Sequence, residues 1–104
     1  MRTYNKLVRD KIPQINKEKG IAYKATTLNY EEYRIELNKK LKEEADEYLA
    51  DSSLEELADL QEVIYAILDE RIISKEDFEK KRLEKVERRG AFKDRVFLET
   101  LDID

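Results

Sequence analysis

The sequence contains no cysteine and no histidine among its 104 residues. Their absence excludes disulfide bonds, zinc fingers, thiol nucleophiles and imidazole general bases. Any metal ion bound by this chain must therefore take oxygen ligands, and carboxylate-rich sites suit Mg²⁺ or, as a second choice, Mn²⁺. Glycine occurs only twice and proline once, and so few helix breakers favour long helices over a turn-rich β fold.

Charge balance and the lack of long apolar runs exclude two further classes of protein. The 25 acidic and 21 basic residues give a formal net charge of −4, which does not suggest a protein that binds duplex nucleic acid. No apolar run approaches the ~20 residues of a membrane span, and the residues after Met1 lack an apolar signal core. We therefore expect a cytoplasmic protein without a membrane partner, and the length predicts a single helical domain over residues 1–104.

Capping signals and apolar periodicity predict an all-α fold, an antiparallel helical bundle. Its four helices are expected at approximately residues 10–19, 30–50, 53–71 and 75–89. Their expected N-caps are, in chain order, Asp10, Asn29, Ser52 or Ser53, and Ser74. Gly20 and Gly90 are expected to end the first and last helices. Residues 22–28 and 95–99 are predicted to be short extended segments that pair as strands near Tyr23.

Two acidic helical turns flank a short break between Lys40 and Asp59. Glu44 and Glu47 are three residues apart in the first turn, and Glu56 and Asp59 are three apart in the second. On a helix this spacing places side chains on one face, with Cβ atoms roughly 5–6 Å apart. If the two helices pack antiparallel, the four carboxylates converge in the manner of a metal site.

Glu44 and Glu56 are the hardest of these acids to explain as solvated charges. At about 100° per residue, Glu44 falls within an apolar stripe formed by Tyr30, Tyr33, Leu37, Leu41, Ala45 and Tyr48. A carboxylate there needs a partner, which is either a metal ion or a buried Lys or Arg. Glu56 lines up with Leu60, Val63 and Ile67, although it is alternatively the capping-box partner of Ser53.

Apolar residues of the third predicted helix occupy two of its sides, which predicts neighbours on both, one of them from a second subunit. The fourth predicted helix carries a basic cluster that includes Lys85, Arg88 and Arg89. Such a cluster complements the helix dipole, and it is equally suited to neutralising phosphate charge.

Residues 40–47 (KLKEEADE) followed by 56–59 (ELAD) resemble the EExxE…ExxD pattern of the MazG-like nucleoside triphosphate pyrophosphohydrolases. Phosphoribosyl-ATP pyrophosphohydrolases share this pattern. Residues 3–15 (TYNKLVRDKIPQI) also resemble the N-terminus of one small-protein branch of that superfamily, which disfavours phosphoribosyl-ATP as the substrate. Residues 84–89 (EKVERR) with Phe92 are similar to the basic segment that follows its third conserved helix.

This resemblance implies an all-α fold, Mg²⁺ dependence, a homodimer or higher oligomer, and hydrolysis of a nucleoside triphosphate to a monophosphate and pyrophosphate. The metal ligands it implies are Glu44, Glu47, Glu56 and Asp59. Glu43 and Glu44 are the implied catalytic carboxylates. The implied phosphate-binding residues are Lys85, Arg88, Arg89, Lys6, Arg9 and Lys11. Only eight residues separate Glu47 from Glu56, fewer than usual in the superfamily, which leaves little room for a loop that shapes the nucleotide pocket.

A different class of function stays open on the sequence alone. The acidic pairs of a non-catalytic helical interaction or regulatory module would bind Lys or Arg of a partner protein. Mg²⁺ dependence separates the two hypotheses, because an ion that binds only the native state raises its melting temperature.

Overall fold

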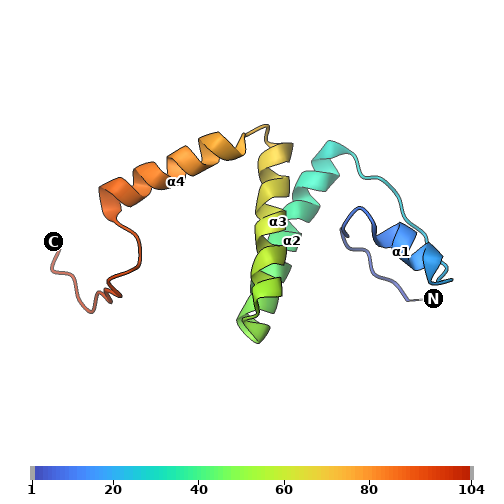
Figure 1. Ribbon diagram of the computed structural model, residues 1–104, viewed down its shortest axis with the longest axis horizontal. Coiled ribbons are helices and arrows are strands. Elements are labelled where there is room, and N and C mark those ends of the chain that lie inside the picture. The colour runs from blue at the N-terminus through green and yellow to red at the C-terminus, as the bar shows by residue number, and fades with distance from the viewer. Residues whose placement is uncertain (1, 104) are drawn as a thin grey trace. The chain divides into compact units, whose positions relative to one another are not determined.

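The computed structural model describes residues 2–103, and all regular secondary structure in that range is helical. The four helices are α1 (Ile12–Glu18), α2 (Tyr30–Asp51), α3 (Leu54–Glu70) and α4 (Lys75–Arg89) (Figure 1). The predicted all-α class is confirmed, and the predicted helix bounds differ from the observed ones by two residues or fewer.

The chain divides into two compact units, Met1–Ile73 and Ser74–Asp104. The first unit contains α1, α2 and α3, and the second contains α4 and the residues after it. The expectation of one domain over residues 1–104 stays a prediction.

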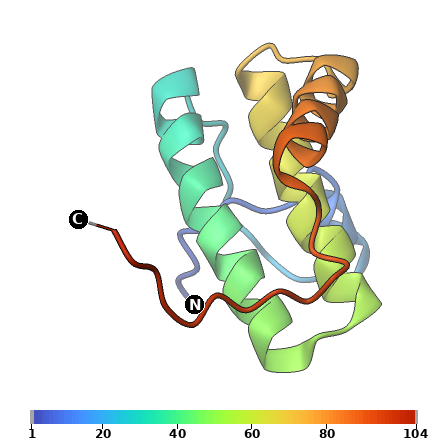
Figure 2. The same ribbon diagram turned by 90° about the vertical axis from the view of Figure 1, so that its left-hand side faces the viewer.

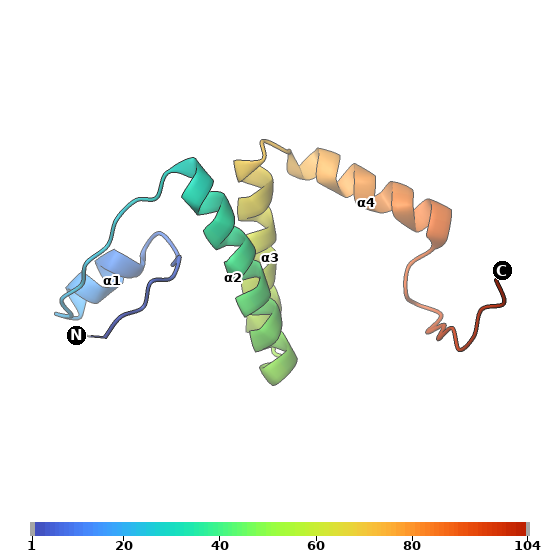
Figure 3. The ribbon, with the colours of Figure 1, turned by 180° about the vertical axis from the view of Figure 1, so that it is seen from behind.

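In the first unit, α2 and α3 pack against each other as an antiparallel hairpin (Figures 2 and 3). Three apolar side chains of this hairpin are buried, namely those of Leu37, Val63 and Leu68. Leu37 lies on the apolar stripe of α2, whereas Val63 and Leu68 lie on two sides of α3, as the apolar periodicity predicts. At the open end of the hairpin, Arg34 on α2 forms an ion pair with Glu70 on α3 at 2.8 Å.

Ser52 and Ser53, the two residues between α2 and α3, have different roles. Ser52 ends α2 in the left-handed conformation, with φ at 49° and its N–H donating to the carbonyl of Tyr48. Ser53 is the N-cap of α3, and its Oγ accepts from the backbone N–H of Glu56 at 3.2 Å. Of the two predicted caps, Ser53 is therefore the one that forms.

Two other predicted caps are confirmed, and the one at α1 is wrong. Asn29 accepts from the N–H of Glu32, and Ser74 accepts from the N–H of Asp77. Asp10 does not cap α1, because the N-cap is Lys11, whose φ of −89° and ψ of −3° are helical rather than extended. That backbone already turns at Arg9, whose carbonyl accepts from the N–H of Ile12, so no side chain takes the usual capping position.

Helices α1 and α3 both end in the hydrogen-bond pattern that requires a left-handed residue after the helix. For α1 that residue is Gly20, with φ at 72°, as predicted. For α3 it is Ile72, with φ at 58°. The N–H groups of Ile72 and Ile73 donate to Asp69 and Leu68. A β-branched residue is strained in this conformation.

No strand forms among residues 2–103. The predicted strands at residues 22–28 and 95–99 are therefore wrong, although both segments do lie outside the helices. Their apolar side chains are mostly exposed, Tyr23 at 46% and Val96 at 85%, and a lone two-stranded ribbon without a buried face is marginal in water.

None of the helices in the described part of the chain is both long and apolar enough to cross a membrane.

Candidate metal centre

The antiparallel packing of α2 and α3 brings the two acidic turns together. Carboxylate oxygens of Glu43, Glu44 and Glu47 lie within 4.8 Å of one another, and so do those of Glu44, Glu56 and Asp59. Glu44 belongs to both groups. We call these five residues the acidic cluster, and it contains all four predicted metal ligands and both predicted catalytic carboxylates.

Glu44 is the buried member of the acidic cluster, with 7% of its surface exposed. Its Oε1 lies 3.5 Å from Nζ of Lys40, whereas its Oε2 is buried without a hydrogen-bond partner. Burial, and next the charge of Glu47, raise the pKa of the Glu44 carboxyl, and Lys40 opposes that rise. Its position on the core-facing stripe is as predicted.

Glu70, in the same hairpin, is a buried carboxylate with a hydrogen-bonded cationic partner. The side chain of Glu70 is only 3% exposed, yet both Nε and Nη2 of Arg34 contact its Oε1 at 2.8 Å. Glu44 has only the more distant Lys40 ammonium. A buried carboxylate oxygen without a donor is costly, so this Glu44 oxygen is open to a further cation.

Glu56 carries the second buried carboxylate oxygen that lacks a hydrogen-bond partner. Its backbone N–H is the group that Ser53 caps, but its Oε2 is buried without a hydrogen-bond partner. Burial, followed by the charges of Glu47 and Asp59, raises the pKa of the Glu56 carboxyl. The Ser53 cap accounts for the start of α3 and leaves this carboxylate oxygen without a partner.

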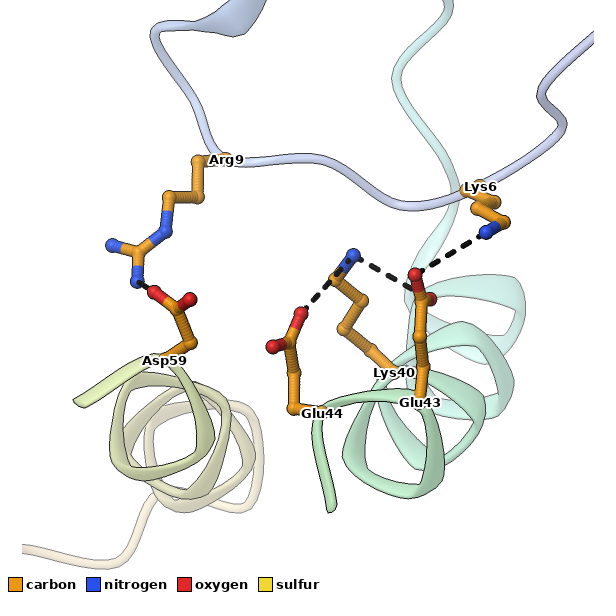
Figure 4. A network of polar contacts seen from close by, with 6 residues as sticks. All are labelled: Lys6, Arg9, Lys40, Glu43, Glu44 and Asp59. Atoms are coloured by element: carbon orange, nitrogen blue, oxygen red, sulfur yellow. Dashed lines mark hydrogen bonds and ion pairs between the residues drawn. The ribbon is translucent and has the colours of Figure 1, made fainter. Parts of the chain in front are cut away.

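Three bases of the same unit lie against the acidic cluster (Figure 4). Lys40 lies between Glu43 and Glu44, with its Nζ 3.5 Å from an oxygen of each. From the chain ahead of α1, Lys6 contacts Glu43 at 3.3 Å and Arg9 contacts Asp59 at 2.7 Å. Two of the predicted phosphate-binding bases thus contact predicted site carboxylates, Lys6 a catalytic one and Arg9 a metal ligand.

A cleft of about 570 Å³ adjoins the acidic cluster in the first unit. Glu44 and Asp59 line it together with the basic residues Arg9, Lys11 and Lys40. Its apolar lining includes Leu7, Ile12, Ile15, Leu37, Val63 and Ala66. Tyr33 lines it as well, and burial, followed by the charge of Asp10, raises the pKa of its hydroxyl. The cleft therefore combines charged and apolar walls.

The donor set fits a hard divalent cation. All five groups of the acidic cluster offer carboxylate oxygens, which Mg²⁺ and Mn²⁺ prefer. Two of those oxygens are buried and unpartnered, and like charges this close repel unless a cation lies between them.

Three of the predicted site residues lie in the second unit. Lys85, Arg88 and Arg89 are exposed on α4 in the second unit, and their role in phosphate binding stays a prediction. Sequence reasoning assigned no role to Lys40 or Tyr33, although Lys40 precedes Glu44 by one helical turn and Tyr33 lies on the same apolar stripe.

Comparisons with protein-family models, with curated proteins and with solved structures found no match to this chain.

Proposed function

We propose that this protein is a Mg²⁺-dependent nucleotide pyrophosphohydrolase that converts a nucleoside triphosphate to a monophosphate and pyrophosphate. Excess or non-standard nucleotides are the substrates we expect. One observation supports the proposal above all: Glu44, shared by both groups of acids, is buried with an oxygen that has no partner. The EExxE…ExxD resemblance of the same residues supports it independently.

In this proposal Glu44, Glu47, Glu56 and Asp59 hold the ion. Bound there, Mg²⁺ would supply Lewis-acid stabilisation of the phosphate oxygens and activation of a water. Mn²⁺ would replace it with similar ligands.

The chain's own residues then have distinct tasks. Glu43 is the one member of the acidic cluster that is not a proposed ligand, and it is left to orient a water. Arg9 and Lys11, which line the cleft, neutralise the triphosphate. Tyr33 and the apolar lining accept the nucleoside, since an aromatic ring stacks on any base. The α4 bases Lys85, Arg88 and Arg89 are proposed as further phosphate contacts.

A nucleotide panel assayed with and without Mg²⁺ for pyrophosphate release tests this function. We expect release that requires the metal, and we expect Glu44→Gln to lower it by about 10²–10³-fold, the range seen when one group that stabilises transition-state charge is removed. Asp46→Asn is the matched control, because Asp46 is exposed on the same helix and paired with Lys42 at 2.7 Å. No release from any nucleotide by folded protein would refute the proposal.

The competing function is the non-catalytic interaction or regulatory module. The contacts of Lys6, Arg9 and Lys40 show that this acidic cluster can bind basic side chains, which favours a partner rich in Lys or Arg. Mg²⁺ titration followed by thermal unfolding separates the two, since a module of this kind shows no rise in melting temperature with the metal.

The sparse core supports the predicted homodimer or higher oligomer. Only three apolar side chains are buried among residues 2–103. On the hairpin, Ile35, Leu49 and Leu54 are 52%, 75% and 82% exposed. Burying such side chains between copies would supply the apolar area that a chain of this length lacks. Light scattering coupled to size-exclusion chromatography tests this proposal, and a monomer at micromolar concentration would contradict it.

A further inference from the structure

The chain ahead of α1 crosses the acidic cluster as a strap, residues 3–10 (Figure 4). Its two ion pairs join Arg9 Nη2 to Asp59 Oδ1 at 2.7 Å and Lys6 Nζ to Glu43 Oε1 at 3.3 Å. Leu7 is half-buried between these bases, and the other strap residues are exposed. The strap is therefore attached mainly by two ion pairs and one apolar side chain.

The two ion pairs of the strap occupy carboxylates in both groups of the acidic cluster. Glu43 belongs to the first group and Asp59 to the second. With Lys40, the strap bases place three positive charges against five carboxylates. When all are ionised, the assembly keeps a formal charge of −2, which one divalent cation neutralises. Lys6 and Arg9 therefore act as counterions in the metal-free protein, and a metal ion competes with them.

Both pairs are well suited to exchange. The side chains of Lys6 and Arg9 are 53% and 58% exposed, and exposed ion pairs change an equilibrium only about two- to fivefold. A guanidinium also binds phosphate through two parallel hydrogen bonds. Arg9 lines the cleft beside Glu44 and Asp59, so a polyphosphate bound next to a metal ion lies within its reach.

We propose that Arg9 and Lys6 exchange partners: they neutralise Asp59 and Glu43 without metal, and they bind the polyphosphate once a divalent cation has taken Asp59 as a ligand and has neutralised the charges beside Glu43. This inference rests on the proposed function, because it requires the acidic cluster to bind Mg²⁺. Metal and anion binding are then coupled through the strap. The coupling is reciprocal, so pyrophosphate tightens Mg²⁺ binding by the same factor as Mg²⁺ tightens pyrophosphate binding.

Arg9→Met should change the two affinities in opposite directions. Calorimetric titration with Mg²⁺ alone should show binding about two- to fivefold tighter than in the wild type, because a competing counterion is removed. With saturating Mg²⁺, pyrophosphate should bind about 10- to 100-fold more weakly, because a charged hydrogen-bond donor is lost. Lys6→Met should shift both affinities in the same directions, and it provides the test should Arg9→Met unfold.

Arg2→Met is the charge-matched control. Arg2 lies in the same N-terminal segment, with its guanidinium 5.4 Å from the ring centre of Tyr4. Removal of this charge should leave Mg²⁺ binding unchanged. An equal tightening in Arg2→Met would show that net charge, and not partner exchange, sets the affinity, and it would overturn the proposal.

The remaining outcomes separate this inference from the function on which it rests. Wild-type binding of Mg²⁺ with no tightening in Arg9→Met and Lys6→Met would overturn the exchange and leave the metal centre intact. Tighter Mg²⁺ binding with unchanged pyrophosphate affinity would also overturn it, because the released bases would then have no anion role. Failure of the wild type to bind Mg²⁺ would overturn the metal centre and the exchange together.

Discussion

Glu44→Gln should stabilise the metal-free protein while it destroys the metal site. The substitution keeps the shape of the side chain and removes one negative charge from a cluster whose carboxylate oxygens lie within 4.8 Å of one another. At that separation two unit charges repel by about 3 kcal/mol for an effective dielectric constant near 20. The amide NH₂ group also offers donors to the neighbouring carboxylates.

Lys40 reduces this gain, because its Nζ lies 3.5 Å from Glu44 Oε1 and loses a charged partner in the variant. We therefore expect a net stabilisation on the order of 1 kcal/mol, which corresponds to a rise of about 4–8 °C in melting temperature for a small domain. In Mg²⁺ at one hundred times its dissociation constant, the wild type should gain about 2.7 kcal/mol, and the variant far less. The order of stability should thus reverse when the metal is added.

Thermal unfolding followed by circular dichroism, in EDTA and in Mg²⁺, measures both effects. Asp46→Asn is the control, and it should change stability by no more than about 0.5 kcal/mol in either condition, because it breaks one exposed helical ion pair. Destabilisation of metal-free Glu44→Gln by 1 kcal/mol or more would refute the reasoning. In that case Glu44 would be a structural partner of Lys40.

Three further predictions concern the same unit. Ile72→Gly should raise stability by about 1 kcal/mol, because glycine adopts the left-handed conformation without the strain that a Cβ causes, and Ile72 is 93% exposed. Ile72→Ala keeps the Cβ and should give no such gain in urea unfolding. Ser53→Ala should lower stability by about 1 kcal/mol, because α3 loses its capping acceptor, and an unchanged unfolding midpoint would contradict that role. The pKa of the Glu44 carboxyl is raised in the native state. Between about pH 4.3, where a free Glu titrates, and this raised pKa, the native state therefore binds more protons than the unfolded chain. Stability of the metal-free wild type should therefore decrease with increasing pH across this window, more steeply than in Glu44→Gln, and equal slopes in pH-dependent melting curves would contradict it.

Capping residues and apolar periodicity were sufficient to predict the helices, because both act over one or two helical turns. Asn29, Ser53 and Ser74 cap their helices through the backbone N–H three residues on, which is a matter of spacing alone. Asp10 is not the cap, because the chain already turns at Arg9, one residue earlier, where the carbonyl accepts from the N–H of Ile12. Spacing alone did not reveal this early turn.

The sequence by itself determined that the fold is helical, that Glu44 lies on a buried stripe, and that two acidic turns face each other if their helices pack antiparallel. These results follow from helical periodicity and short-range hydrogen bonding. Only the tertiary structure decided that Glu44 belongs to both groups of acids, that one oxygen of Glu44 and one of Glu56 lack partners, and that the strap brings Lys6 and Arg9 onto Glu43 and Asp59. Those contacts join residues 37 and 50 positions apart, and pairings of that range depend on how the helices pack.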